Sequence, residues 1–194
     1  MPKSRSVTRE DVLKAAAEVV RKRGETGLNV RAVAEELGCS TQPVYSLFAS
    51  MEELKAALFE EAKAQYRRYI DVYLESACRS RYESYGMGFV RFAREERGLF
   101  RYLFLRSSEK SVFSIKDPYL PDIIEEMMTL YHMTEDKAMA FHTDMAVFSF
   151  GLGVLVNAGE PLTDEEVSKA FKREFFALYA LYFPERPHFW EHKE

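Results

Sequence analysis

The stretch of sequence that decides the fold is residues 28–48, which read LNVRAVAEELGCSTQPVYSLF. Asn29 suits the N-cap of a short helix whose apolar side chains recur at three- and four-residue steps, and Gly38 is placed to end that helix in a left-handed conformation. Ser40 suits the N-cap of a second short helix, in which Pro43 falls in the first turn, where the absent amide donor costs little. Two short helices joined by a turn that contains Gly predict a helix-turn-helix unit.

Longer helices flank this unit on both sides. Thr8 and Asp11 form a capping-box pattern, after which apolar residues recur at helical spacing. Ser50 and Glu53 form a second such pattern, and the helix that they open runs to about Leu74. We therefore expect a support helix before the helix-turn-helix unit and a connecting helix after it.

The remainder of the chain also has a helical pattern. Helical periodicity covers residues 82–96, 98–106, 121–131, 135–157 and 164–182, and no run with strand periodicity interrupts it. We therefore expect an all-α protein in two parts. The first is an N-terminal three-helix helix-turn-helix head at residues 1–48, and the second is a C-terminal helical bundle at residues 49–194.

Composition places the chain among globular proteins. Its 194 residues are 47% hydrophobic and 30% charged, with a formal net charge of −4, which excludes disordered and collagen-like chains and a general polycation. Cys39 and Cys78 lie far apart and in no CxxC or Cys/His cluster, so we expect neither a disulfide framework nor a zinc site. No apolar leader is visible, and the longest apolar stretch, residues 146–156, is too short to span a bilayer. We expect a cytoplasmic protein that does not contact a membrane.

Polar side chains gather on the outer side of the second short helix. Its apolar residues, Val44, Leu47 and Phe48, can be buried. The residues that remain outside are polar or phenolic: Ser40, Thr41, Gln42, Tyr45 and Ser46. Gln pairs with adenine through two hydrogen bonds, Ser and Thr bond to bases or phosphates, and a Thr methyl or a Tyr ring meets a thymine methyl. These residue types favour insertion into the major groove of DNA.

Positive charge is concentrated toward the amino-terminal end. Residues 1–50 carry 8 Lys and Arg against 6 Asp and Glu, whereas the rest of the chain carries 19 against 25. Lys3, Arg5 and Arg9 lie before or at the start of the first helix, and we expect them to follow a phosphate backbone if DNA binds. The asymmetry is modest, so it supports DNA binding only together with the helix spacing.

With these residues the sequence resembles the TetR-type (TetR/AcrR) family of transcriptional regulators. The resemblance covers roughly residues 8–60 and rests on residues 28–40, residues 43–48 and the pair Glu53-Leu54. Asn29 stands where the family commonly has Thr, and Asn is an equally good cap. Met51 stands where the family usually has a Lys that touches a phosphate, and Lys55, one turn later, can partly replace it.

The resemblance implies a homodimer that presents two helix-turn-helix units to successive major-groove segments of a palindromic operator. It also implies that the carboxyl-terminal helices sense a small molecule, so residues 49–194 are expected to form a ligand-sensing and dimerisation domain. The residues expected to contact double-stranded DNA are Lys3, Arg5, Asn29, Arg31, Ser40, Thr41, Gln42, Tyr45, Ser46 and Lys55.

The last two helical segments carry wide apolar stripes. Segment 164–182 has large apolar residues on one side and further apolar residues, among them Ala170 and Ala177, on the other, as a helix packed on both its own core and a partner would. By resemblance, these segments form the dimer interface, and a wholly intramolecular core is the alternative. The interface residues expected are Phe148, Leu152, Leu155, Phe171, Phe175 and Leu178.

Aromatic and Met residues of the bundle are candidates for lining an apolar effector site. His142 is the most distinctive of them, because an imidazole on an apolar stripe needs a partner. Ordinary core packing is the alternative for every member. The set is Phe89, Phe92, Phe104, Met127, Tyr131, Phe141, His142 and Met145. Its composition favours a hydrophobic, aromatic or lipid-like effector over a sugar or a nucleotide.

Enzyme signatures are absent from the sequence. It contains no GxxxxGK[ST], GxGxxG, GxSxG or HExxH pattern, and its one ExxH, Glu185 and His188, lies in a Pro-flanked tail. We therefore expect no catalytic site, no cofactor and no metal. The expected function is a ligand-responsive transcriptional repressor. The alternative is a helix-turn-helix fold that is used for protein contact without operator binding.

Overall fold

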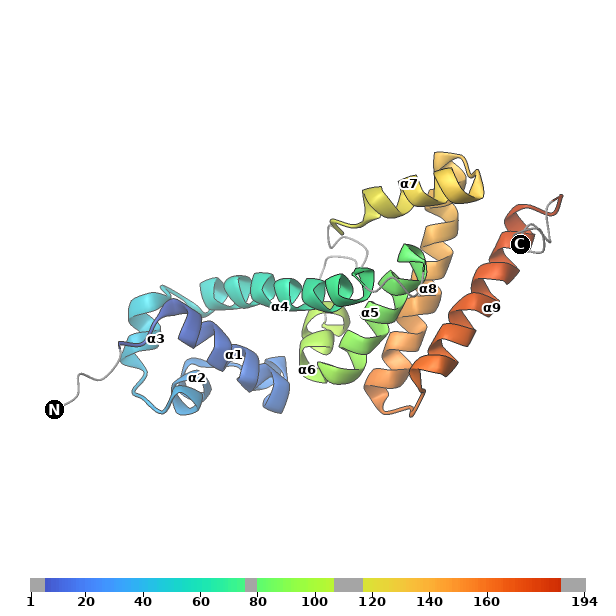
Figure 1. The fold of residues 1–194 in the computed structure, drawn as a ribbon. Helices are drawn as coiled ribbons and strands as arrows, with labels where there is room; N and C mark the ends of the chain where they lie inside the picture. The colour runs from blue at the N-terminus through green and yellow to red at the C-terminus, as the bar shows by residue number, and fades with distance from the viewer. Residues whose placement is uncertain (1–5, 76–79, 107–116, 186–194) are drawn as a thin grey trace. The chain divides into compact units, whose positions relative to one another are not determined.

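The computed structural model describes residues 6–75, 80–106 and 117–185, and within these ranges every regular element is a helix (Figure 1). The expected all-α fold is confirmed. The amino-terminal helices are α1 (Arg9–Arg23), α2 (Val30–Leu37), α3 (Gln42–Leu47) and α4 (Met51–Leu74). The later helices are α5 (Arg81–Glu95), α6 (Arg97–Phe100), α7 (Leu120–Tyr131), α8 (Glu135–Ala158) and α9 (Asp164–Tyr182). Lys3, Arg5, Cys78 and His188 lie outside the described residues.

The ends of α1 and α2 follow the predicted capping residues. The Thr8 hydroxyl accepts a hydrogen bond from the Asp11 amide at 3.2 Å, and the Asp11 carboxylate accepts one from the Thr8 amide at 2.9 Å. Asn29 caps α2 through its side-chain oxygen, which accepts from the Ala32 amide at 3.0 Å. Gly38 ends α2 with φ 66°, in the left-handed region that favours glycine.

The start of α3 differs from the prediction. Ser40 does not cap this helix, which begins at Gln42 after Thr41. Thr41 already has helical backbone angles (φ −72°, ψ −14°), whereas a capping residue normally has extended ones, and no side chain caps the helix. The expected cap at Ser40 is therefore wrong, and the amino-terminal end of α3 has only its backbone contacts.

The single regular helix expected at residues 98–106 is also wrong. α6 covers only Arg97–Phe100, and Arg101–Leu105 forms a π-helical turn. The three consecutive residues Tyr102, Leu103 and Phe104 are all buried there, which a helix with one apolar side would not achieve. Tertiary packing has thus overridden the local pattern.

The contacts between residues divide the chain into two compact units. The first comprises Met1–Arg68 and Glu95–Val112, and the second comprises Tyr69–Arg94 and Phe113–Glu194. The head helices α1 to α3 therefore share their unit with most of α4 and with α6. The functional boundary that we placed at residue 48 stays a prediction.

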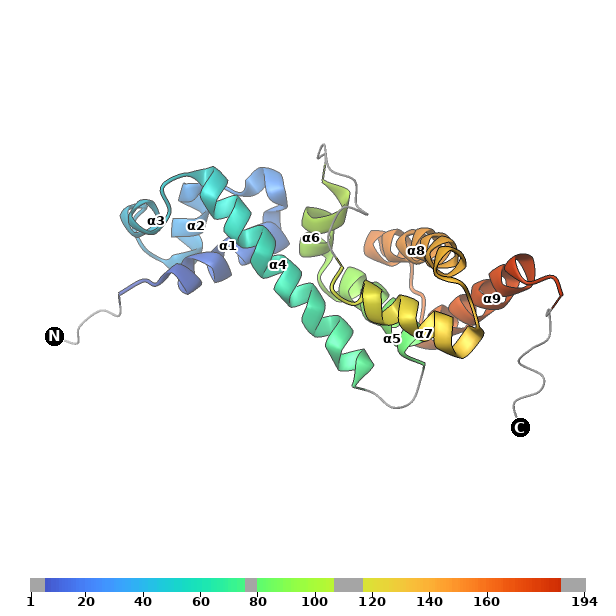
Figure 2. The same cartoon turned by 90° about the horizontal axis from the view of Figure 1, so that it is seen from above.

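In the first unit α1 is the central element, because it packs against α2 and α6 (Figures 1 and 2). Its inner side chains Val12, Ala16 and Val20 are fully buried. Gly98 of α6 lies directly on α1, since a Cβ atom at this position would be 2.6 Å from the Cα of Arg21 and 2.7 Å from the carbonyl oxygen of Val20. Only glycine allows the two backbones to approach this closely.

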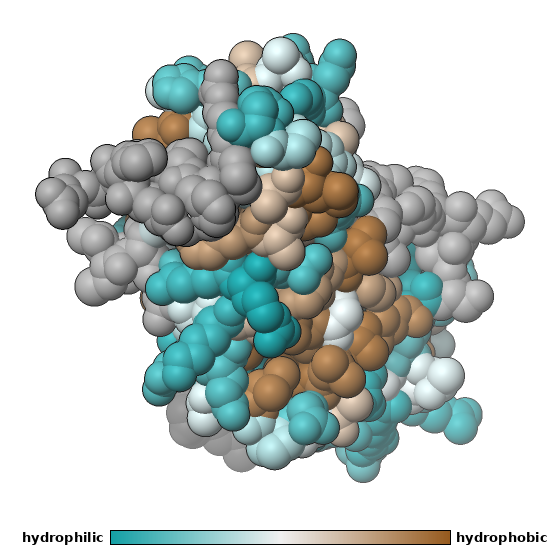
Figure 3. Space-filling model, turned by 90° about the vertical axis from the view of Figure 1, so that its right-hand side faces the viewer, coloured by the Kyte–Doolittle hydropathy of each residue, from teal (hydrophilic) through white to brown (hydrophobic). Residues whose placement is uncertain are grey.

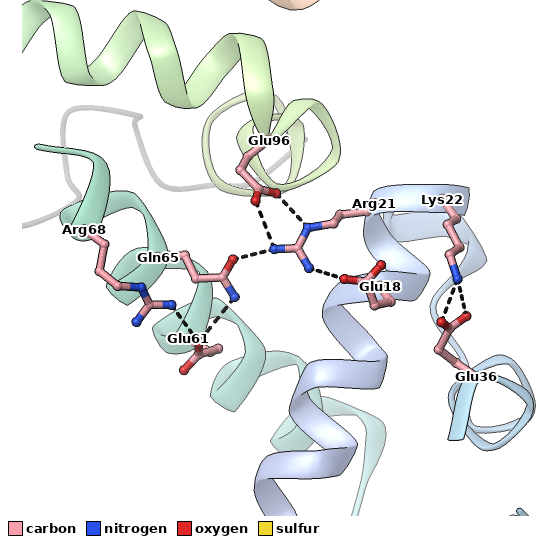
Figure 4. Close-up of polar contacts among 8 residues, drawn as sticks. All are labelled: Glu18, Arg21, Lys22, Glu36, Glu61, Gln65, Arg68 and Glu96. Atoms are coloured by element: carbon pink, nitrogen blue, oxygen red, sulfur yellow. Dashed lines mark hydrogen bonds and ion pairs between the residues drawn. The ribbon is translucent and has the colours of Figure 1, made fainter. Parts of the chain in front are cut away.

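Arg21 joins three helices of the first unit (Figure 4). Its guanidinium donates to Glu96, just before α6, at 2.7 Å, to Gln65 of α4 at 2.5 Å, and to Glu18 of α1 at 2.5 Å. Lys22 of α1 donates to Glu36 of α2 at 2.6 Å. These polar contacts tie α2, α4 and α6 to the carboxyl-terminal end of α1.

In the second unit α8 packs against both α7 and α9. Large side chains such as Phe92, Met127, Phe141 and Tyr179 are buried and form its core. The one buried amide of α8, that of Asn157, donates to the carbonyl of Ala93 at 3.0 Å, which satisfies its polarity inside the core.

Candidate nucleic-acid interface

The outer face of α3 combines exposed polar side chains with one exposed aromatic ring. Gln42, Tyr45 and Ser46 are exposed, and the Tyr45 side chain is 64% exposed, an unusual value for an aromatic residue. Positions 42, 45 and 46 share one side of a helix because they are three and four residues apart. The arrangement presents an amide, a phenol and a hydroxyl together to an external surface.

The opposite side of α3 fixes the helix to the first unit. Val44 is 1% exposed, and Phe48, the residue after the helix, is 3% exposed. The Ser46 hydroxyl donates to the carbonyl of Pro43 at 2.9 Å, within the helix itself. Ser40 is exposed and Thr41 half-buried in the turn before α3. The structure thus brings the five predicted residues of this region together on or beside one face.

Asn29 is engaged in structure rather than left for a ligand. Its side-chain oxygen accepts from Ala32, and its side-chain nitrogen donates to the carbonyl of Gly27 at 3.1 Å. Each polar end of the side chain therefore makes one hydrogen bond within the protein. The backbone amides in the first turn of α2 give this position a second way to contact a phosphate.

The cations of α1 are paired with carboxylates. On α1, Lys14 pairs with Glu10, Arg21 with Glu18 and Glu96, Lys22 with Glu36, and Arg23 with Glu35. Arg31 of α2 and Lys55 of α4 have no carboxylate within ion-pair distance in the part of the chain that the structure describes. These two cations are available for a phosphate backbone.

Arg9 is not available in the way that we expected. Its guanidinium donates to Glu53 of α4 at 2.8 Å, so its charge is neutralised within the protein. The amide of Ala49 and the guanidinium of Arg9 together hold the pKa of Glu53 below its ordinary value. Glu53 therefore remains a carboxylate and a partner for Arg9 at neutral pH.

The residues predicted to bind an effector fall into both units. Phe104 lies in the first unit, where its ring packs 5.4 Å from that of Tyr66. The others lie in the second unit, where Phe92, Met127 and Phe141 are fully buried and Phe89 and Met145 nearly so. Phe104 therefore lies in a different unit from the rest of the predicted set.

His142 lies among aromatic residues of the second unit. Its Nδ1 is 3.5 Å from the hydroxyl oxygen of Tyr82, and its ring lies 6.4 Å from that of Tyr85. Burial lowers the pKa of His142, and the charge of Asp117 opposes this effect only in part. The ring of Tyr131, which is half-buried, packs 5.0 Å from that of Phe175. The half-buried His142 and Tyr131 are the accessible members of the predicted set.

The residues predicted for a dimer interface separate into two groups. Leu152 and Phe171 are buried in their own chain, and Phe175 packs its ring 5.1 Å from that of Phe141. Leu155 is 50% exposed, and Phe148 and Leu178 are half-buried. Exposed apolar residues that we did not single out, Val147 on α8 and Leu181 on α9, belong with this second group.

Sequence reasoning missed the contacts that hold the head together. Arg9 and Glu53 are 44 residues apart, and Arg21 and Glu96 are 75 residues apart. No local pattern links residues at such separations, and one sequence carries no record of which pairs meet. Gly98 gave a signal only as a break between two helical patterns, not as a point of close backbone contact.

Comparison with known proteins connects this geometry to a family. Residues 12–61 match the family model described as bacterial regulatory proteins, tetR family. The matched range includes most of α1, all of α2 and α3, and the start of α4. No curated protein matches the chain.

Several solved structures share the fold over most of the chain. A TetR-like transcriptional regulator from Rhodococcus sp. RHA1 has 17% identity and a TM-score of 0.69, over 92% of this chain and 98% of that one. The multidrug binding protein EbrR, complexed with imidazole, has 16% identity and a TM-score of 0.59, over 86% of this chain and 93% of that one. A TetR family member from Streptomyces coelicolor A3 has 19% identity and a TM-score of 0.56, over 86% and 96%. At these identities the likeness shows the fold.

The family match therefore agrees with the exposed polar face of α3, and the shared fold extends over both units. The match to the family model over residues 12–61 and the fold shared with TetR-type regulators together support a TetR-type, DNA-binding transcriptional regulator.

Proposed function

We propose that the protein is a ligand-responsive repressor that binds a palindromic operator as a homodimer and is released by a small hydrophobic or aromatic effector. The observation that carries the DNA-binding part is the outer face of α3, where Gln42, Tyr45 and Ser46 are exposed above a buried anchor at Val44. Arg31 and Lys55, which lack ion pairs among the described residues, supply positive charge for phosphates.

The proposed homodimer rests on the apolar surface of α8 and α9. Figure 3 shows hydrophobic side chains gathered over one face of the molecule and bordered by hydrophilic ones. Val147 and Leu155 on α8 are 57% and 50% exposed, and Leu181 on α9 is 72% exposed. Gly151 of α8 is exposed and has open space around its Cα, so a second helix could approach closely there. A second copy of this chain would cover these residues.

The composition of α8 supports the same proposal. This helix is long and apolar enough to cross a membrane by length and composition alone, although the apolar stretch at residues 146–156 had suggested a shorter segment. Only 28% of its most apolar window is buried within the chain. Asp136, Lys137 and Asp144 lie on the same helix and are exposed. We therefore assign α8 to a protein interface in a cytoplasmic protein rather than to a bilayer.

The proposed effector site lies in the second unit, near His142 and Tyr131. These two residues are half-buried, whereas Phe92, Met127 and Phe141 of the same unit are fully buried. An effector that reaches the buried residues must separate helices of this unit. Effector binding would therefore favour a different conformation of the protein. The similarity in fold to a multidrug binding protein supports a small-molecule effector.

Release from the operator would follow from linkage between the two sites. A dimer fixes the separation of its two α3 helices, and operator half-sites one helical turn apart demand one value of that separation. An effector that prefers a different separation weakens operator binding, and the operator must weaken effector binding by the same factor. This reciprocity holds whichever residues carry the coupling.

The experiment that tests the DNA-binding proposal begins with selection of bound duplexes from a random-sequence library by the full-length protein. The highest-affinity duplex, called the selected duplex below, is compared with a scrambled duplex of the same composition by fluorescence anisotropy. Gln42→Ala and Tyr45→Ala are expected to cost about 1–3 kcal/mol on the selected duplex and little on the scrambled one. Equal losses on both would assign these residues to phosphate contact.

The alternative function is protein contact through the helix-turn-helix fold without operator binding. Met51, which stands in place of an expected phosphate-binding Lys, favours it. Under this alternative the library yields no preferred sequence, and Lys55→Ala has no effect on the salt dependence of DNA binding.

A further inference from the structure

Arg9, the first residue of α1, contacts both ends of the turn that joins α3 to α4. Its Nη1 donates to the carbonyl oxygen of Leu47, the last residue of α3, at 2.8 Å. Its Nη2 donates to Glu53 of α4 at 2.8 Å, and its guanidinium carbon lies 3.9 Å from the centroid of the Phe48 ring. One side chain thus bonds to the end of the recognition helix, packs on the ring that follows it and pairs with the next helix.

Glu53 extends this set of contacts to the turn itself. Its second carboxylate oxygen accepts from the amide of Ala49 at 2.8 Å, and its own amide donates to the Ser50 hydroxyl at 3.1 Å. The capping box expected at Ser50 and Glu53 is thereby modified, because the carboxylate reaches Ala49 rather than Ser50. Every residue from Leu47 to Ser50 has a contact with either Arg9 or Glu53.

This arrangement matters because α3 has little structure of its own to rely on. It is six residues long, no side chain caps its start, and a helix of that length is unstable in isolation. Its orientation therefore depends on contacts with α1, α2 and α4. Val44 supplies a buried anchor within α3, and the Arg9 contacts fix its carboxyl-terminal end.

The geometry of Arg9 also argues against direct phosphate binding. Two of its donor groups are engaged within the protein, its flat face rests on Phe48, and its charge is balanced by Glu53. A Lys at this position would keep the positive charge but could not make the forked pair of bonds together with the stacking contact. The two roles therefore predict different results for an Arg-to-Lys change.

We propose that Arg9 is a positioning residue for the recognition helix: with Glu53 it holds the carboxyl-terminal end of α3 at the angle at which Gln42 and Tyr45 reach the bases. This inference rests on the proposed DNA-binding function. It assigns to Arg9 and Glu53 a part in sequence discrimination, although neither touches DNA.

The test measures the affinity of full-length variants for the selected and scrambled duplexes over a salt series. Arg9→Lys is expected to weaken binding to the selected duplex about tenfold or more, to leave the scrambled duplex nearly unchanged, and to leave the salt slope at its wild-type value. If Arg9 instead contacts a phosphate directly, the expected results differ. Arg9→Lys would then bind like the wild type, and Arg9→Ala would lose equally on both duplexes with a salt slope smaller by about 1.

Glu53→Ala distinguishes a positioning role of Arg9 from direct phosphate binding, because the two roles predict opposite changes in DNA affinity. Removal of an acidic side chain near a phosphate backbone raises DNA affinity if only charge matters, whereas loss of the Arg9 partner lowers it on the selected duplex. The matched control is Glu52→Ala, which removes the neighbouring exposed carboxylate and is expected to bind both duplexes as well as or better than the wild type. Higher affinity of Glu53→Ala on the selected duplex would overturn the proposal.

A measurement without DNA keeps the proposal testable if a variant folds poorly. Hydrogen exchange at the amides of Phe48 and Ala49 is expected to be about tenfold faster in Arg9→Lys, with exchange in the core of α1 unchanged. Unchanged exchange at these two amides contradicts the positioning role. If the wild-type protein itself does not distinguish the two duplexes, the proposed function fails, and the exchange result still decides whether Arg9 organises the turn.

Discussion

At the scale of single residues, the half-buried His142 is the group in the second unit whose protonation would disturb packing. Burial lowers its pKa, with Asp117 as a partial counterweight, and its Nδ1 lies 3.5 Å from the Tyr82 hydroxyl oxygen. In an unfolded chain a His titrates near about pH 6.5. Below that value the unfolded state binds more protons than the folded state, so stability falls as the pH falls.

This sign gives a specific prediction for acid conditions. The free energy of unfolding, measured by denaturant titration with circular dichroism, is expected to decrease between about pH 7 and pH 5. His142→Gln is expected to remove most of that decrease. His132→Asn serves as the control, because His132 is exposed and has a left-handed backbone (φ 53°), which Asn tolerates. A decrease of the same size in His142→Gln would show that another group is responsible.

At the scale of elements, α6 and α1 approach each other closely through their backbones in the first unit. A Cβ atom at Gly98 would lie 2.6 Å from a backbone atom of Arg21, and backbone atoms cannot move aside as the end of a flexible side chain can. The hydrogen bonds of Arg21 to Glu96 and Gln65 surround this contact. α6 is therefore part of the structure that supports the head.

Gly98→Ala is expected to separate α6 from α1 and to lower the free energy of unfolding by about 1–3 kcal/mol, as overpacking does. Urea denaturation measures this difference. Lys14→Ala on α1 is the control, because its side chain is 67% exposed and its ion pair with Glu10 lies on the surface, so a change within about 0.5 kcal/mol is expected. Wild-type stability in Gly98→Ala would mean that the two helices are not in backbone contact.

Helix positions were predictable from sequence where local chemistry decides them. Thr8 with Asp11, Asn29 and Gly38 marked real helix ends, because a cap is a contact between residues three or four positions apart. The errors at Ser40 and at residues 98–106 arose where tertiary contacts decide, as with the hydrogen bond of Tyr102 to α4.

The candidate DNA-binding site was also predictable from sequence only where residues close together in the chain decide it. The exposed face of α3 followed from the spacing of Gln42 and Tyr45 against Val44 within one helix. The role of Arg9 could not be predicted, because its partner Glu53 is remote in sequence. A cation before a helix-turn-helix unit is also consistent with a phosphate contact. Likewise Phe171 was assigned to a partner surface, whereas it is buried beside Gly86 of its own chain.

At the scale of the whole molecule, the proposed dimer follows from the exposed apolar residues of α8 and α9. Leu155→Glu would place a charge on that surface, where a partner would have to desolvate it without an opposite charge. The dissociation constant of the dimer is expected to rise about 100-fold or more. Analytical ultracentrifugation over a concentration series measures the change.

Val72→Glu is the matched control for this variant. Val72 is an apolar residue of α4 that is 60% exposed, and it does not belong to α8 or α9. The Val72→Glu variant is expected to remain a dimer. A wild-type protein that sediments as a monomer, or a Leu155→Glu variant that remains as dimeric as Val72→Glu, would contradict the proposed interface.

The central claim, that this chain is a dimeric regulator that reads DNA through α3, is tested most directly by an anisotropy titration of the wild-type protein on the selected and scrambled duplexes across a salt series. The account predicts binding to the selected duplex that is tighter by about 1,000-fold or more, two protomers per duplex or a multiple of two, and affinity that falls steeply with salt. Equal affinity for both duplexes, or no binding to either, would contradict it.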